Sequence, residues 1–355
     1  MKREIKIFGA GLSGLTASIN LAREGYDVVL YEKEKRIGGL DKCTPSIHMT
    51  PLHFQKMKEF IGIDIESCFS ELDSFKAYIY AKTVLFNPKH LYVTERGPNK
   101  TSLENFLYKI AIEEGVNFEF SHPLKKEMIH SIPKNSIIAV GGCSSIWQDL
   151  NIRFIPFIHF DSYKKIQQKN NFCLTYFDSY LVGYGYIAAK DGLASVTVAF
   201  MLNQPYNEYL KKFKNHIKED KFEFDKWSLV RDNFPEKIYL FKKIHGKTQI
   251  LTGAVSGFLD PFFGFGVNSS LTSGKIAALA VTSKEKGIKE FRRFTRNLNR
   301  MFILSRVYDF MPLRNEIIEK LFRNTGRGLP IIKKNMKSIP GFTHDDCFKI
   351  QKIIN

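Results

Sequence analysis

The sequence lacks the features of a secreted, disulfide-stapled or membrane-spanning protein. Its five cysteines are odd in number and widely spaced, without a Cys-x-x-Cys pair, which argues against a disulfide framework or a zinc site built from clustered thiols. No apolar run approaches the roughly 18 residues needed to cross a bilayer. The chain passes directly from Met1 into a strand-like run, which leaves no room for a signal peptide. We therefore expect a cytoplasmic protein.

Several functional classes also lack their sequence patterns. No grouping of His, Cys, Asp and Glu has metal-ligand spacing, so we predict no metal site, and no Ser-His-Asp set is recognisable. Acidic residues are scarce, 36 against 53 Lys and Arg, which gives a net charge of +17. Such a charge implies an anionic partner, or only a lysine-rich genome. Because no nucleic-acid-binding module is recognisable, we expect no nucleic acid partner.

Residues 5–34 carry the pattern of a βαβ unit. An apolar run at 5–8 predicts a buried strand, GAGLSG follows at 9–14, and residues 15–24 have helical spacing. A second apolar run at 27–31 ends at Glu32. Strand, glycine loop, helix, strand and terminal acid occur in the order of a dinucleotide-binding unit.

Each glycine of this loop has a separate role in such a unit. Gly9 makes the tight turn, Gly11 lets the backbone approach a pyrophosphate, and Gly14 allows close packing of helix on strand. The helix N-terminus then faces the phosphates, and Glu32 accepts hydrogen bonds from a ribose diol. We therefore predict dinucleotide binding rather than a glycine-rich turn without a ligand.

The remaining chain alternates between two patterns. Buried strands are expected at 136–142 and 250–254 and a capped amphipathic helix at 101–114, whereas residues 152–245 carry alternating, aromatic-rich strands typical of an antiparallel sheet. These patterns predict a mixed α/β fold in which a Rossmann-like cofactor domain contains an inserted, mostly antiparallel β cap domain. The expected boundaries are 1–75, 96–150 and 246–284 for the cofactor domain, 76–95 and 151–245 for the cap domain, and 285–355 for a C-terminal helical region.

A second glycine-rich stretch, QILTGAVSGFLDPFFGFGVNSSLTSGK, occupies residues 249–275. Its Asp260-Pro261 pair and GFGVN at 264–268 resemble the second FAD signature of flavoproteins that share the p-hydroxybenzoate hydroxylase fold. The resemblance implies that FAD is the cofactor, with this loop and the next helix N-terminus along the ribityl chain and the flavin pyrimidine edge. It implies FAD contacts at Gly9, Gly11, Leu12, Ser13, Gly14, Glu32, Lys33, Gly38, Gly39, Arg96, Gly141, Gly253, Ala254, Asp260, Pro261, Gly264, Gly266, Val267 and Asn268.

Within that fold, the sequence is most similar to the geranylgeranyl reductase group. Asp41-Lys42-Cys43 resembles the Lys-Pro-Cys-Gly region of that group, whose cysteine lies near the flavin. Residues 180–200 resemble its Gly-Tyr-x-Trp-x-Phe-Pro-Lys segment. The resemblance implies a catalytic role for Cys43 and contact of Tyr184 and Tyr186 with an apolar substrate.

Several positions depart from the family pattern. Ala254 replaces an aspartate that bonds a ribityl hydroxyl, and Gly141-Gly142 stands in place of an Asp-Gly pair. Tyr186 replaces a tryptophan, Ala188-Ala189 replace Phe-Pro, and the Pro and Gly around Cys43 are missing. Loss of such a charged hydrogen bond costs about 1.5–3 kcal/mol of FAD binding unless backbone or water substitutes for it.

Structural roles also explain the individual candidates. Cys43 fits a small buried hydrophobe, and Tyr184 and Tyr186 fit the core of a cap domain. His48 and His53 fit structural histidines as well as acids beside a flavin. Residues 284–306 have a basic side and apolar residues at helical spacing, which fits either contact with an anionic membrane or a helix packed on the cap.

The sequence therefore leaves three functional hypotheses. The resemblance implies an FAD-dependent reductase that transfers hydride from reduced flavin to a carbon–carbon double bond of a long, isoprenoid-type lipid, with ferredoxin or NAD(P)H as electron donor. An aromatic monooxygenase or halogenase of the same fold is the second hypothesis. The third is a degenerate flavin-fold binding protein without turnover, which Ala254 and Gly142 favour.

Overall fold

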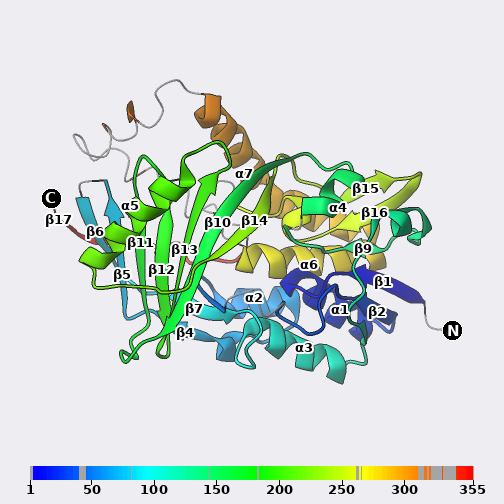
Figure 1. Ribbon diagram of the computed structural model, residues 1–355. Helices are drawn as coiled ribbons and strands as arrows, with labels where there is room; N and C mark the ends of the chain where they lie inside the picture. Colours follow the sequence, from blue (N-terminus) through cyan, green and yellow to red (C-terminus); the bar gives the residue numbers. More distant parts are fainter. Residues whose placement is uncertain are drawn as a thin grey trace.

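The computed structural model describes residues 3–39, 45–80, 82–142, 144–181, 184–260, 264, 266–310, 316–317, 320, 330 and 341–354. These residues form two larger sheets and one small sheet (Figure 1).

The first large sheet has six strands in the order β15-β16-β9-β1-β2-β8. Neighbouring strands are parallel except the β15–β16 hairpin at one edge. The strands are β1 Glu4–Phe8, β2 Asp27–Tyr31, β8 Asn117–Glu119, β9 Ile137–Ile138, β15 Phe241–Ile244 and β16 Lys247–Leu251.

Helices cover both faces of this sheet. Helices α1 (Leu12–Arg23), α3 (Leu103–Glu113) and α6 (Val267–Thr282) pack on the face that carries Ile7 and Leu30. The opposite face packs against helix α4 (Ser144–Asp149) and the 3₁₀ turn η2 (Lys126–Ser131), with Trp147 fully buried. Two covered faces explain why the central strands β1, β2 and β9 carry apolar residues on both sides.

The second large sheet has eight strands in the order β14-β10-β13-β12-β11-β5-β6-β17, and only its β11–β5 pair is parallel. Helix α5 (Tyr206–Glu219) covers its outer face and buries Phe213 there (Figure 1). The strands are β5 Ser74–Ile79, β6 Lys82–Phe86, β10 Phe154–Lys165, β11 Phe172–Phe177, β12 Gly185–Lys190, β13 Leu193–Met201, β14 Ser228–Pro235 and β17 Ile350–Ile354.

A small sheet, in the order β3-β7-β4, joins the two large ones. It consists of β3 (Ser46–Pro51), β7 (Leu91–Arg96) and β4 (Phe69–Glu71), and helix α2 (Phe54–Ile61) follows β3. The backbone N–H of Ile47 on β3 donates to Ser195 Oγ on β13 over 2.7 Å. Strand β3 therefore lies against the inner face of the cap sheet, the face opposite α5.

The structure corrects three placements made from the sequence. Strand β15 belongs to the first sheet and not to the cap, because it forms a hairpin with β16. Strand β7, expected in the cap, pairs with β3 and β4. The C-terminal region is not wholly helical, because β17 pairs antiparallel with β6. Alternating apolar residues reveal a strand but not the sheet in which it pairs.

Helix α7 (Lys284–Phe310) packs apolar residues on both domains. Its Phe302 approaches Phe234 on β14 of the cap sheet, with ring centroids 6.3 Å apart. Phe291 approaches Phe258, Phe294 approaches Phe60, and Leu298 is fully buried. In the described part of the chain, none of the helices combines the length and apolar character needed to cross a bilayer.

Candidate functional site

The glycine loop between β1 and α1 has the geometry of a phosphate cradle. Gly9 has a φ of 110°, and a Cβ there would lie 2.3 Å from the Ala139 carbonyl oxygen. A Cβ on Gly14 would lie 1.9 Å from the Gly9 carbonyl oxygen, whereas one on Gly11 would meet no heavy atom within 4 Å. No side chain caps α1, so the first N–H groups after Gly11, those of Leu12 and Ser13, suit an anion.

Glu32 is fixed at the end of β2, beside this loop. It is only 9% exposed, and its Oε2 accepts a hydrogen bond from the Ala10 N–H over 2.7 Å. Its Oε1 accepts one from the Glu34 N–H over 3.0 Å. An ionised carboxylate has four lone-pair sites, so two remain for a ribose diol. Lys33 follows, with its ammonium 3.6 Å from Glu34 Oε1.

Ser13 joins the first glycine loop to the second. A Cβ on Gly253 would lie 2.5 Å from Ser13 Oγ, and a Cβ on Gly274 of α6 would lie 2.4 Å from the Ser13 carbonyl oxygen. Ala254, which replaces the family's aspartate, is half-buried at the start of a 3₁₀ turn (η3, Ala254–Ser256). The two signatures, more than 200 residues apart in sequence, therefore meet.

The N-terminus of α6 forms the other end of this region. Helix α6 starts at Val267 after Gly266, and no side chain caps it. A Cβ on Gly264 would meet no heavy atom within 4 Å. Asp260 is fully buried. Asn268 has a structural role, because its Nδ2 donates to the Pro51 carbonyl oxygen of β3 over 2.7 Å.

Four further predicted cofactor positions have different surroundings. Gly38 has a φ of 85° and makes room for the Gly97 carbonyl oxygen, which lies 2.1 Å from where a Cβ of Gly38 would be. Gly39 follows it with a φ of 97°. Arg96 forms an ion pair with Glu104 of α3. Gly141 has a φ of 66°, and a Cβ there would lie in open space.

The two predicted substrate tyrosines lie on the inner face of the cap. Tyr184 precedes β12 and Tyr186 lies on it, with ring centroids 5.8 Å apart, and both side chains are half-buried. Burial raises the pKa of Tyr186 well above its usual value, so its hydroxyl stays protonated at neutral pH. Tyr184 also stacks on Phe177 at 5.4 Å. The structure thus brings both tyrosines together on one face.

A buried acid–base group on the same face was not predicted. His159 and Asp161 on β10 form an ion pair, with 2.9 Å between Nδ1 and Oδ2, and Asp232 on β14 lies 3.9 Å from His159 Nε2. Burial disfavours protonated His159, but contact with Asp161 outweighs burial, so the pKa of His159 is raised. Burial raises the pKa of Asp232, partly opposed by His159.

This acid–base group touches the cofactor domain through Gly142. A Cβ on Gly142 would overlap Asp232, and Asn233 Nδ2 donates to the Gly142 carbonyl oxygen over 2.9 Å. Strand β14 therefore lies directly against the loop after β9. The space that a side chain at residue 142 would occupy is therefore taken by the carboxylate of Asp232.

His48 approaches from β3, between the cap face and Arg96. Its Nε2 lies 2.9 Å from Ser46 Oγ, and its ring centroid is 6.3 Å from that of Tyr186. Burial, and then the charge of Arg96, lower the pKa of His48 to about 3, so the ring is neutral at physiological pH. His48 and His159 therefore have opposite pKa shifts although both border this face.

Sequence reasoning missed His159, Asp161 and Asp232 because they lie on two different strands. Alternation along β10 places His159 and Asp161 on one face, and that polar pair in an aromatic strand was a detectable signal. The proximity of Asp232 depends on the pairing of β10 with β14. Cys43 and Pro261 lie outside the residues that the structure describes.

Comparisons with sequence families and curated proteins match only parts of the chain. A family model described as an NAD(P)-binding Rossmann-like domain matches residues 7–44. A flavin-containing monooxygenase, FMO GS-OX-like 6 of Arabidopsis thaliana, is 44% identical over 45 residues, which are 13% of this chain and 10% of that protein. A 4-hydroxybenzoate brominase (decarboxylating) of Marinomonas mediterranea is 29% identical over 113 residues, 28% of this chain and 22% of that protein. The chain thus matches less than a quarter of the length of these two relatives.

Similar solved structures match nearly the whole chain. A geranylgeranyl bacteriochlorophyll reductase-like protein from Thermoplasma acidophilum has a TM-score of 0.65 at 15% identity, covering 90% of this chain and 91% of that one. The flavin-dependent brominase Bmp2 has a TM-score of 0.64 at 14% identity, covering 96% and 95%. At these identities the likeness shows the fold alone. The chain has a Rossmann-like α/β domain with an antiparallel β-sheet domain, the fold of p-hydroxybenzoate hydroxylase-like flavoproteins.

Proposed function

We propose that this protein is an FAD-dependent reductase of carbon–carbon double bonds in a long apolar, isoprenoid-type substrate. The observation that carries the proposal is the meeting of both glycine loops at Ser13, next to a cap face with half-buried tyrosines and an acid–base group. Two uncapped helix N-termini, those of α1 and α6, belong to this region.

The residues present fit FAD. Gly11 and the N-terminus of α1 would hold the pyrophosphate, and Glu32 would hold the adenosine ribose. Gly141 and Gly264, whose missing Cβ atoms leave room, would border the ribityl chain and flavin. The N-terminus of α6 would stabilise negative charge on the reduced ring. The half-buried Ala254 offers no side-chain hydrogen bond, so this site relies on backbone groups.

When bound and reduced, FAD supplies a hydride to one carbon of the double bond. The other carbon needs a proton, which the protein must supply. His159 suits this task because Asp161 favours its protonated form, and Asp161 holds the ring in place. His48 is neutral and suits a role in positioning rather than as an acid. Cys43, which the resemblance implies beside the flavin, is the alternative proton donor.

The test is the visible spectrum of the purified protein, followed by anaerobic reduction with dithionite and addition of prenyl compounds. We expect oxidised-flavin bands that bleach and return with a prenyl alkene. The variant His159→Gln should re-oxidise about 100-fold more slowly or worse, since general acids contribute about 10²–10⁴-fold. Comparison with Cys43→Ser decides which residue donates the proton. A colourless protein that takes up no FAD would contradict the proposal and favour a binding protein without turnover.

One observation favours a monooxygenase or halogenase of the same fold. An apolar alkene needs a single proton donor, whereas this face carries His159, Asp161 and Asp232 together. Such a group suits deprotonation of a phenolic substrate. Oxygen consumption upon addition of NAD(P)H and a phenol, without re-oxidation by prenyl compounds, would support this second candidate in place of the reductase.

A further inference from the structure

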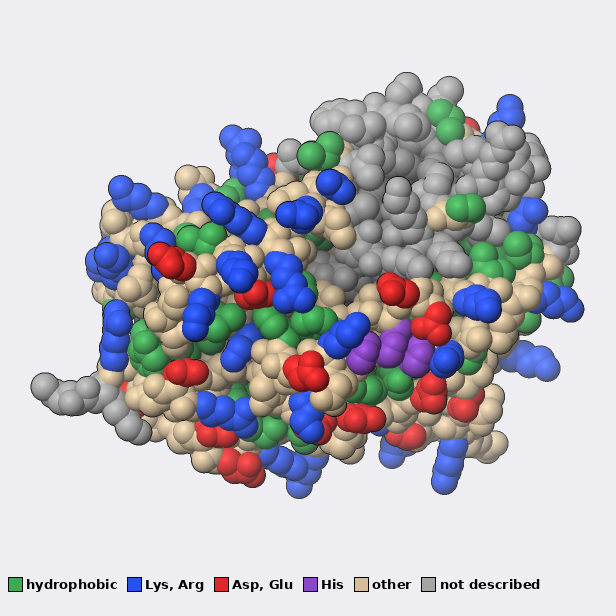
Figure 2. All heavy atoms as spheres, turned by 180° about the vertical axis from the view of Figure 1, so that it is seen from behind, with side chains coloured by type: hydrophobic (Ala, Val, Ile, Leu, Met, Phe, Trp, Pro, Cys, Tyr) green, Lys and Arg blue, Asp and Glu red, His purple; other side chains and the backbone are tan. Residues whose placement is uncertain are grey.

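Three histidines stack on one another at the surface, where the C-terminal segment 341–354 meets the body of the protein. The ring of His344 lies between those of His53 and His90, with centroids 4.1 Å and 3.7 Å away and interplanar angles of 1° and 12°. Figure 2 shows histidine side chains gathered in a row on this face. Residues far apart in the sequence therefore bring three imidazoles together.

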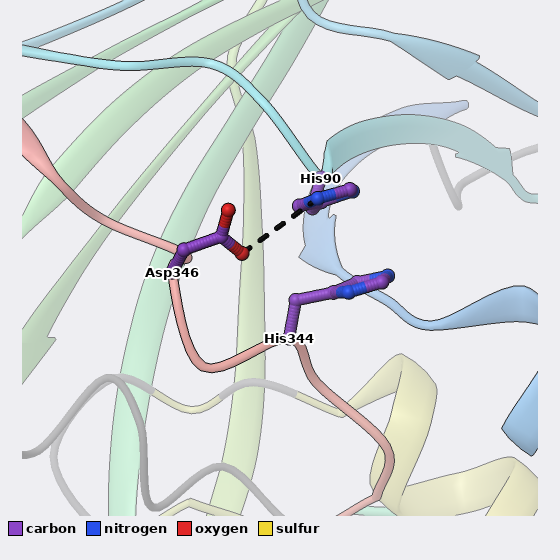
Figure 3. A group of neighbouring side chains, drawn as sticks. All are labelled: His90, His344 and Asp346. Carbon is purple, nitrogen blue, oxygen red and sulfur yellow. Dashed lines mark ion pairs between the residues drawn. The ribbon is translucent and has the colours of Figure 1, made fainter.

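A carboxylate completes this group. Asp346 Oδ1 lies 3.6 Å from His90 Nε2, and Figure 3 shows the carboxylate beside the two rings and directed toward His90. One donor atom from each of His90, His344 and Asp346 lies within 4.8 Å of the other two. Among the described residues, no other set of three His, Cys, Asp or Glu side chains has its donor atoms this close together.

The distance between His90 and Asp346 suits two ligands of one metal ion better than it suits a direct hydrogen bond. At 3.6 Å, the His90–Asp346 pair is longer than a hydrogen bond. In a tetrahedral zinc site, bonds of about 2.0–2.2 Å set neighbouring donors roughly 3.3–3.6 Å apart. Side-chain shifts on the order of 1 Å bring His344 to the same spacing.

Access from solvent also fits a cation. Asp346 is half exposed, so an ion can enter. Its other carboxylate oxygen lies 3.7 Å from the Lys89 ammonium, which an incoming cation must displace.

Backbone hydrogen bonds hold the segment that carries His344 and Asp346 against the segments that carry His53 and His90. The His53 N–H donates to the Phe342 carbonyl oxygen over 3.1 Å, and the Asn87 N–H donates to the Lys349 carbonyl oxygen over 2.8 Å. Cys347 Sγ lies 3.7 Å from the His90 carbonyl oxygen. The backbone that carries the group is therefore held in place before any ion binds, so only the side chains must reorient.

We propose that His90, His344 and Asp346 bind a divalent transition-metal ion of the zinc type, with water or His53 as a fourth ligand. Imidazole and carboxylate donors suit zinc, and the nearly parallel rings must tilt toward the ion. The ion would fasten the segment that carries β17 to the turn before β7. The site is independent of FAD and of the proposed reaction.

The experiment is calorimetric titration of the untagged, full-length protein with zinc chloride after treatment with EDTA. We expect one equivalent of zinc to bind and to raise the thermal unfolding temperature. His344→Ala should weaken binding at least about tenfold, since even outer-shell changes cost 10–100-fold. Asp346→Asn should also weaken it, and this half-exposed position tolerates substitution should His344→Ala fail to fold.

The matched control is His245→Ala. The rings of His245 and His130 are also close, with centroids 3.7 Å apart and tilted by 32°, but among the described residues they do not belong to a group of three donors. This variant should bind zinc as the wild type does. Equal zinc binding by the wild type, His344→Ala and Asp346→Asn would overturn the proposal, as would a wild type that binds no zinc.

Discussion

Gly9 and Gly11 lie two residues apart but have different surroundings. Substitution of Gly9 should therefore affect folding, whereas substitution of Gly11 should affect ligand binding. Gly9→Ala places a methyl group against the Ala139 carbonyl oxygen at a φ of 110°. We expect it to lower the free energy of unfolding by about 2 kcal/mol or more. Gly11→Ala meets no protein atom, so it should fold normally but weaken FAD binding. Urea unfolding and flavin titration of both variants check this, and equal effects on stability would contradict it.

His48 and His159 should affect stability at opposite ends of the pH range. The pKa of His48 falls to about 3, so its stabilising contribution is present above about pH 6.5 and is lost as the pH drops toward 3. His48→Gln should therefore reduce the loss of stability between pH 6.5 and 4. Urea unfolding across this range measures it, and an unchanged slope would show that His48 is not buried as a neutral ring.

The pKa of His159 is raised, so its contribution is full below about pH 6.5 and is lost as the pH rises through the folded-state pKa. His159→Gln should therefore cost more unfolding free energy at pH 6 than at pH 9. Asp161→Asn should show the same trend, because Asp161 causes the raised pKa. A cost for His159→Gln that is constant with pH would argue against the ion pair.

At the scale of elements, β17 protects an edge of the cap sheet. It pairs with β6, and the register places Ile353 opposite Val84. Removing residues 350–355 would expose the backbone of β6, and an exposed edge strand pairs readily with other chains. We expect a loss of roughly 1–3 kcal/mol and a tendency to self-associate. Urea unfolding and light scattering test this, and a monomeric truncated protein of unchanged stability would count against it.

The packing of α7 bears on whether its apolar residues contact a membrane or pack inside the protein. Phe291 and Phe294 pack against the cofactor domain and Leu298 is fully buried, so these residues are not available to enter a membrane. Arg292 and Arg296 remain exposed on the other side. The apolar pattern therefore reflects internal packing, and only the basic side is left to attract an anionic surface.

At the scale of the whole molecule, the net charge of +17 predicts salt-sensitive adsorption to anionic membranes. The protein should sediment with vesicles rich in phosphatidylglycerol at low salt and be released by high salt, because salt screens exposed charges. Replacing Arg292 and Arg296 by Glu should reduce the bound fraction. Equal binding to neutral vesicles, or no effect of salt, would show that charge does not drive the contact.

The sequence by itself determined the cofactor half of the molecule. The βαβ unit is local, since the glycines, the apolar strands and Glu32 all act within about 30 residues and need no distant partner to be recognised. The second glycine stretch was identified by its resemblance to a flavoprotein signature, and the two stretches meet at Ser13. The antiparallel character of the cap was also readable from its alternating strands.

Only the tertiary structure decided which strands are neighbours, and with them the chemistry of the inner face. Asp232 reaches His159 because β14 pairs with β10, and β15 joins the first sheet because it pairs with β16. His90 and His344 are 254 residues apart, so no spacing rule brings them together. Alternation fixes the face on which a side chain lies, but pairing between distant segments depends on the packing of the whole chain.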